Sequence, residues 1–253
     1  MTIRTHDIVA GLRALGIDEG AKLVFHSSLK SFGFVDRGAE AVIDALLETV
    51  GPDGTVIVPT MTFGAPFERA TSPSLCGAVT EAFRLRPDAI RSDHPTHSVA
   101  AIGVDSARLL EGHADTLPNG PASPLGKLAR EGGFVVLAGV GHESNTTIHI
   151  AQHLAGLPIF KKYREVEVTG PDGVTQTKRV MIPGCSRGFG RLEPYIEARR
   201  AQKKALIGDA MVRVLRGSDV VSIGTDTLRR HPCALLCDSR DCGWCADAEA
   251  ILR

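Results

Sequence analysis

The order strand, helix, strand near the start of the chain is the sequence feature that most limits the fold. The apolar segment Lys22–His26 predicts a short buried strand, and the apolar residues on one face of 39–50 predict a helix. The turn residues Gly51–Gly54 are followed by Thr55–Pro59, which predicts a second strand. Two strands connected through a helix are typical of parallel pairing, so we expect an α/β fold.

Further segments extend this pattern. The near-continuous apolar run Phe134–Val140 predicts a central strand, and a helix is expected from about Thr146 to Ala155. Two segments on either side of Gly170–Gly173 predict a hairpin, and a basic amphipathic helix is expected near 205–216. The sequence has no obvious internal repeat or linker, so a single domain over residues 1–253 is the simplest prediction.

The composition excludes several classes of function. Lys and Arg number 29, and Asp and Glu also number 29, so the net charge is zero. Proteins that bind nucleic acid usually carry a basic excess or stripe. No apolar run approaches the roughly 20 residues that a membrane helix needs, and the first residues lack a signal-peptide pattern. We therefore expect a cytoplasmic protein that binds neither nucleic acid nor a membrane.

Two junctions between a strand and a helix carry the polar residues best suited to chemistry. The small hydroxyls and backbone N–H groups of His26–Leu29 can hold a phosphate or cap a helix. In the second junction, Gly139–His153, His149 falls about one turn into the expected helix and Gln152 follows three residues later. A histidine at such a place is suited to general-base catalysis, or is a core histidine with both nitrogens satisfied. The spacing leaves both interpretations open.

The spacing of His149 and His153 is also that of a zinc-binding pair, and His142 could complete a hydrolytic metal site. Zinc proteases with this spacing place a glutamate directly after the first histidine, where this chain has Ile150. That difference argues against a metal-dependent hydrolase.

Four of the six cysteines lie close together in the segment 231–253, which forms a Cys-rich tail. They are Cys233, Cys237, Cys242 and Cys245. The final C-x-x-C pattern is a common half-site for structural zinc, and the two earlier thiols would complete a tetrahedron, with His231 able to replace one of them. The alternative is four reduced thiols packed in a terminal hairpin. A redox role would require a thioredoxin-like setting, which the sequence lacks.

Several segments in consistent order resemble the aminoglycoside 3-N-acetyltransferase family. They are His26-Ser27-Ser28-Leu29, Gly38–Val42 with Gly51–Thr55, Arg91–Ser98, Ser123-Pro124, and Gly139 with Ser144–His149. The resemblance covers about Thr5 to Val214. It implies a three-layer α/β sandwich around a mixed, largely parallel sheet, of the antibiotic N-acetyltransferase type and distinct from the commoner GNAT fold.

The resemblance also implies a function: one acyltransferase domain that moves an acetyl group from acetyl-CoA to an amine of an aminoglycoside-like molecule. His149 corresponds to the catalytic histidine and would act as general base. Gln152 stands where relatives often have an acidic residue, and Glu143 is the alternative source of negative charge. Backbone N–H groups near the strand ends, or at Ser28, would stabilise the oxyanion.

The residues that the resemblance implies in coenzyme A binding are His26, Ser27, Ser28, Leu29, Ser98, Ser123 and Thr146. An alternative hypothesis is a coenzyme A-binding homologue with a different acceptor or without catalysis. The sequence leaves open the acceptor amine, the acyl chain length and whether the chain forms a homo-oligomer.

Overall fold

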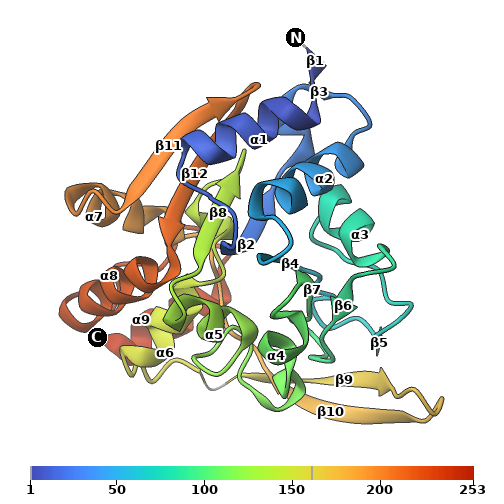
Figure 1. Ribbon diagram of the computed structural model, residues 1–253. Coiled ribbons are helices and arrows are strands. Elements are labelled where there is room, and N and C mark those ends of the chain that lie inside the picture. Colours follow the sequence, from blue (N-terminus) through green and yellow to red (C-terminus); the bar gives the residue numbers. More distant parts are fainter. Residues whose placement is uncertain (1, 161) are drawn as a thin grey trace.

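A seven-stranded mixed sheet forms the centre of the computed structural model, which describes residues 2–160 and 162–253 (Figure 1). Its strand order is β11-β12-β8-β2-β4-β7-β6. The strands are β2 (Lys22–Ser27), β4 (Thr55–Pro59), β6 (Ile90–Arg91), β7 (Val99–Gly103), β8 (Phe134–Ala138), β11 (Gln202–Ile207) and β12 (Ala210–Arg216).

Within the described part of this sheet, parallel pairing is confined to the three central strands β8, β2 and β4. Strand β2 pairs in parallel with β8 and β4, while the other four neighbouring pairs are antiparallel. The sheet is mixed, as expected, but its parallel part is smaller than the predicted largely parallel sheet. The reason lies in residues 60–98, which bring β7 back against β4 in the opposite direction instead of crossing over to form a parallel neighbour.

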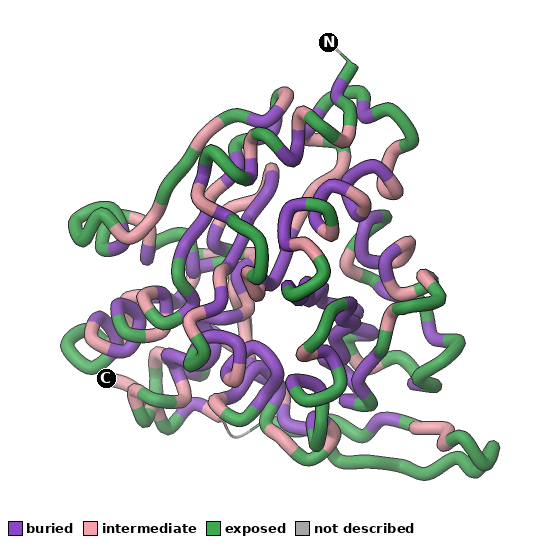
Figure 2. The backbone as a smooth tube through the Cα atoms, viewed as in Figure 1, coloured by how far each residue is buried: buried purple, intermediate pink, exposed green. Residues whose placement is uncertain are grey.

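Successive residues of the central strands face opposite layers. In β2, Leu23 and Phe25 join one hydrophobic core while Val24 joins the other. The first core lies under α1 (Thr5–Ala14), α2 (Ala39–Val50) and α3 (Ala78–Arg84), and the second under α4 (Ser106–Leu110), α5 (Pro124–Arg130), α6 (Ile148–Leu154) and α8 (Gly217–Arg230). The sheet is buried between these two helical layers (Figure 2), which confirms the three-layer α/β sandwich.

The predicted helix at 205–216 is wrong. This segment forms the second half of β11 and all of β12, and the chain turns between the two strands at Gly208 with a φ of 59°. Within β12, Ala210 and Val212 are buried while Met211 between them is exposed, which is the two-residue period of a strand. Strand β12 pairs with β8, and its apolar face packs into the core under α1 and α2, so the tertiary contacts override the local helical pattern.

The remaining elements surround the sheet. The predicted hairpin is present as β9 (Tyr163–Thr169) and β10 (Thr175–Met181), which project from the body (Figure 1); β9 also pairs with β5 (Phe67–Glu68). The other elements are β1 (Thr2–Ile3), β3 (Phe34–Val35), α7 (Glu193–Ala198), α9 (Gly243–Leu252) and the 3-10 helices η1 (Leu29–Phe32), η2 (His113–Asp115), η3 (His142–Ser144) and η4 (Phe189–Leu192). Within the described ranges, no helix has the length and apolar character needed to cross a membrane.

Gly103 at the end of β7 provides a test of the antiparallel β4–β7 pairing. Its φ is 129°, and a Cβ there would meet the Gly54 carbonyl oxygen and lie 2.6 Å from the Thr55 Cα. Gly20 has a φ of 78° with nothing within 4 Å of such a Cβ. We expect Gly103→Ala to lower the free energy of unfolding by about 3 kcal/mol, and Gly20→Ala by about 1 kcal/mol because it adds backbone strain without a clash. Urea denaturation measures both, and equal losses would contradict the close approach of the two strands.

Candidate active site

A pocket of about 200 Å³ opens beside the first turn of α6. Its lining includes residues that follow β4 and β8 and residues that precede β7. These segments meet because β7 runs antiparallel to β4, with Val99 opposite Pro59, so the start of β7 lies at the edge where β4 ends. The described lining residues are Met61, Phe63, Thr96, His97, Asn119, Thr146, His149, Arg164, Met181, Ile182, Pro183, Gly184 and Ser186.

His149 is a buried, neutral imidazole in the wall of this pocket. Its Nδ1 lies 2.8 Å from Oε1 of Gln152, one turn along α6, and its ring meets the ring of Phe189 edge-on with centroids 4.8 Å apart. An amide oxygen only accepts hydrogen bonds, so Nδ1 carries the proton and Nε2 is the unprotonated nitrogen. Burial lowers the pKa of His149 to about 4. The imidazole is therefore a neutral base with a fixed tautomer at neutral pH.

Two polar side chains of the pocket are buried with no hydrogen-bond partner in the described part of the chain: Asn119, through Nδ2, and Thr146, through Oγ1. A buried polar group without a partner costs about 1–3 kcal/mol, which a bound carbonyl or hydroxyl would offset. Asn119 and Phe63 also adopt left-handed backbone conformations, with φ of 49° and 51°. Such conformations are uncommon outside glycine and gather at ligand sites. The sequence analysis missed Asn119, although the dipeptide Asn-Gly is a signal for a left-handed turn.

The ionisable side chains among the described lining residues are either cationic or neutral. Arg164 lines it and donates a hydrogen bond to the Phe63 carbonyl. His97 also lines it, with Nδ1 2.7 Å from the Thr96 hydroxyl, and burial lowers the pKa of His97 well below its usual range. Among the described lining residues there is no carboxylate. Glu143, predicted as a source of negative charge, is exposed in η3 and accepts a hydrogen bond from its own loop, so it does not line the pocket.

The two predicted strand-to-helix junctions lie side by side. Ser27 is opposite Ala138 in the parallel β2–β8 register, and the Ser28 N–H donates to the Ala138 carbonyl at 3.0 Å. The Ser31 hydroxyl donates to the Gly139 carbonyl, also at 3.0 Å. The expectation that the Ser28 N–H stabilises an oxyanion is therefore wrong, because the sheet already uses this donor.

Two serines predicted to bind coenzyme A have hydroxyls engaged inside the protein. Ser98 donates to the Thr60 carbonyl at 2.7 Å and accepts from Arg91 at 3.2 Å. Ser123 caps the start of α5 and donates to the Gly120 carbonyl at 2.6 Å. Both residues are fully buried and neither lines the pocket of His149.

His26 and Ser27, at the end of β2, differ from Ser98 and Ser123 in their hydrogen bonding. Nε2 of His26 and Oγ of Ser27 are buried without a hydrogen-bond partner in the described ranges. Burial lowers the pKa of His26 to about 4. Leu29, the fourth member of this motif, begins η1 and packs against the core under α1 and α2.

The histidines considered for a hydrolytic metal site do not converge. His142 lies beside Asn145, with Nδ1 and Nδ2 3.3 Å apart, and His153 stacks on Phe160 with ring centroids 4.0 Å apart. Together with His149 they form no metal-binding group within the described residues. The geometry does not support a metal-dependent hydrolase.

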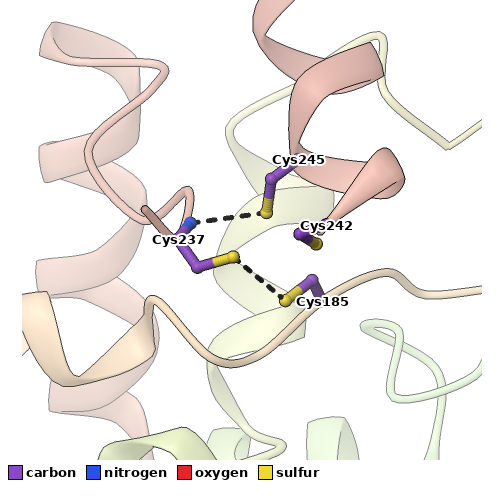
Figure 3. A group of neighbouring side chains, drawn as sticks. All are labelled: Cys185, Cys237, Cys242 and Cys245. Carbon is purple, nitrogen blue, oxygen red and sulfur yellow. Dashed lines mark hydrogen bonds between the residues drawn. The ribbon is translucent and has the colours of Figure 1, made fainter. Parts of the chain in front are cut away.

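Four cysteine sulfurs do converge, next to the loop that follows β10 (Figure 3). They belong to Cys185, Cys237, Cys242 and Cys245, and all lie within 4.8 Å of one another. Three of the four were predicted. Cys233 was predicted but is not in the group, and Cys185 takes its place. Cys185 lies 52 residues before Cys237, so the sequence of the tail itself contains no sign of it.

Comparison with known proteins places the chain in one family. Residues 24–229 match the family model described as aminoglycoside 3-N-acetyltransferase. Aminoglycoside N(3)-acetyltransferase IV of Salmonella sp. is 30% identical over 237 residues, which cover 92% of this chain and 90% of that protein.

Solved structures are similar over nearly the whole chain. The apoenzyme of aminoglycoside acetyltransferase AAC(3)-IVa, and a mutant of it in complex with a gentamicin, each match with a TM-score of 0.90 at 29% identity, covering 99% of this chain and 98% of theirs. AAC-IIIb in a binary complex with CoASH matches with a TM-score of 0.83 at 25% identity, covering 91% of this chain and 97% of that one. The chain therefore belongs to the aminoglycoside 3-N-acetyltransferase family, a family of acyltransferases.

Proposed function

We propose that this protein transfers an acetyl group from acetyl-CoA to an amine of an aminoglycoside, with His149 as general base. The observation that carries the proposal is the hydrogen bond from His149 Nδ1 to Gln152, at 2.8 Å, in the wall of the pocket. It leaves Nε2 as the nitrogen that can accept a proton. The relatives that share the fold support the reaction class: one is an acetyltransferase solved with a gentamicin and another was solved with CoASH.

The reaction requires the amine nitrogen to attack the thioester carbonyl carbon and lose a proton. As the C–N bond forms, the amine becomes strongly acidic, so even a base with a pKa of about 4 can take its proton. Nε2 of His149 accepts that proton. The tetrahedral intermediate then collapses, the C–S bond breaks, and the departing thiolate of coenzyme A takes the proton from the imidazolium.

Asn119 and Thr146 are the candidate donors to the substrates, because their buried polar atoms line the pocket without partners among the described residues. A donor aimed at the developing oxyanion contributes more in a dry pocket than in water. For the coenzyme we favour His26 and the Ser27 hydroxyl, which have no partner among the described residues, over Ser98 and Ser123, whose hydroxyls are already bonded.

A second candidate function is a coenzyme A-binding homologue with a different acceptor. The observation that favours it is the lack of a carboxylate in the described lining of a pocket that contains Arg164, since a polycationic antibiotic gains from nearby negative charge.

The two candidates are separated by measuring acetyl-CoA consumption with a panel of aminoglycosides and simple amines. Product should be detected by mass spectrometry, because the chain's own cysteines react with thiol dyes. Turnover with an aminoglycoside supports the first candidate. Turnover confined to amines with a single charge supports the second.

Replacing His149 tests the general base. We expect His149→Ala to lower kcat by at least about 100-fold, since the proton then has no positioned acceptor. Binding of coenzyme A, measured by calorimetry, should be unchanged. His153→Ala is the matched control: this residue lies one turn later on α6, stacks on Phe160 and does not line the pocket. A His149→Ala variant with near wild-type turnover would show that another group is the base.

Replacing Gln152 tests how the imidazole is tuned. In the folded protein the pKa of His149 is about 4, below its usual 6.5, so the base stays unprotonated until the pH falls towards 4. A carboxylate at position 152 would stabilise the imidazolium, so Gln152→Glu should raise the pKa of His149 and move the acid limb of kcat/KM to higher pH.

The ring proton signals of His149 in an NMR titration, together with the pH-rate profile, measure this shift. Gln176→Glu adds the same charge on the exposed face of β10 and should leave both unchanged. If Gln152→Glu also left both unchanged, Gln152 would not be the residue that positions His149.

A further inference from the structure

We propose that Cys185, Cys237, Cys242 and Cys245 bind one structural zinc ion, and that this ion holds in place the loop 182–188, one wall of the candidate active site. The metal site does not depend on the acceptor or on the chemistry proposed above. The effect of the ion on the pocket has functional meaning only if this pocket, which His149 lines, is the active site proposed above.

The sulfur positions match tetrahedral coordination. The four Sγ atoms lie within 4.8 Å of one another, and those of Cys185 and Cys237 are 3.8 Å apart. With a Zn–S distance of about 2.3 Å, the edge of a ZnS₄ tetrahedron is about 3.8 Å. A disulfide needs a separation of about 2 Å, and all six cysteines of the chain are free. The spacing is therefore that of four ligands around a common centre.

The surrounding backbone favours thiolate ligands. The Cys237 N–H donates to the Cys245 sulfur at 3.3 Å, and the Arg187 N–H donates to the Cys185 sulfur at 3.4 Å. Such donors stabilise the negative charge of metal-bound sulfur and orient it. Figure 3 shows the side chains converging from three segments: the loop after β10, the turn after α8 and the start of α9.

Cys185 connects the metal site to the pocket. Its neighbours in sequence, Gly184 and Ser186, both line the pocket of His149. Loop 182–188 lies between β10 and η4 and has no regular secondary structure of its own. Three of the four ligands belong to the C-terminal tail, so the ion would join this loop to the tail.

Close packing against the tail occurs at both ends of the loop. A Cβ on Gly184 would lie 2.7 Å from Cη2 of Trp244, one of the two residues between Cys242 and Cys245 in the C-x-x-C motif. At the other end, a Cβ on Gly188 would lie 2.7 Å from the carbonyl carbon of Leu236. The ion would keep the tail folded against this loop. Loss of the ion should therefore remove this packing and make the pocket wall more mobile.

Metal content tests the site directly. Full-length protein purified under reducing conditions should contain about one zinc per chain by inductively coupled plasma mass spectrometry. Cys185→Ser and Cys242→Ser should lose this zinc. Cys233→Ser and Cys76→Ser, which remove cysteines outside the group, should keep it. Zinc retained in full by Cys185→Ser would overturn the assignment.

A second measurement on the wild-type protein covers the case in which the Cys185→Ser variant fails to fold. Exchange of the bound metal for Co²⁺ should produce the absorption bands of a tetrahedral tetrathiolate complex. Wild-type protein that binds neither Zn²⁺ nor Co²⁺, or whose four cysteines form two disulfides in freshly purified reduced samples, would overturn the proposal.

Hydrogen exchange tests the effect on the pocket without relying on acetyl transfer. After removal of zinc by a chelator, amides in 182–188 should exchange faster, while those of β8 serve as an unchanged internal reference. Adding Zn²⁺ back should restore the slow exchange. In parallel, KM for the amine should rise more than kcat falls. Exchange in 182–188 that is identical with and without zinc would show that the ion does not hold the wall.

Discussion

The two-sided burial of β2 is the constraint on which the rest of the structure depends. Leu23 and Phe25 enter one core and Val24 the other, and β2 pairs in parallel with β8 and β4. A shift of this strand by one residue would exchange its two faces and misplace both helical layers. The same register puts Ser27 opposite Ala138, so the loops after β2 and β8 emerge together. The candidate active site is built at this edge of the sheet.

Burial also gives the site its chemical character. Gln152 orients His149 through a neutral hydrogen bond, and the surrounding apolar layer disfavours the imidazolium. The same neighbourhood contains Arg164 and no carboxylate among the described lining residues. The pocket thus contains a neutral imidazole and a cationic side chain, and a cationic ligand would meet no opposing charge among its described lining residues.

The Cys-rich tail belongs to the same arrangement. Three of its thiols meet Cys185 of loop 182–188, and Trp244 packs against Gly184 of the same loop. A loop without regular secondary structure makes few hydrogen bonds within itself and needs packing or cross-links from outside to keep one shape. A metal-bound tail would provide both at once, next to the lining of the candidate active site.

Local sequence patterns determined the central strands, helix α2, the β9–β10 hairpin and the place of His149 with Gln152 on one face of α6. Each of these depends on residue spacing within one short segment. Tertiary structure alone decided that 205–216 forms strands, because β8 pairs with β12 and the core under α1 and α2 buries the apolar face. It also decided which residues share the pocket and that Cys185, not Cys233, completes the cysteine group. These contacts join residues far apart in sequence. The sheet and the loops bring them together when the chain folds, and no pattern within one short segment predicts that contact.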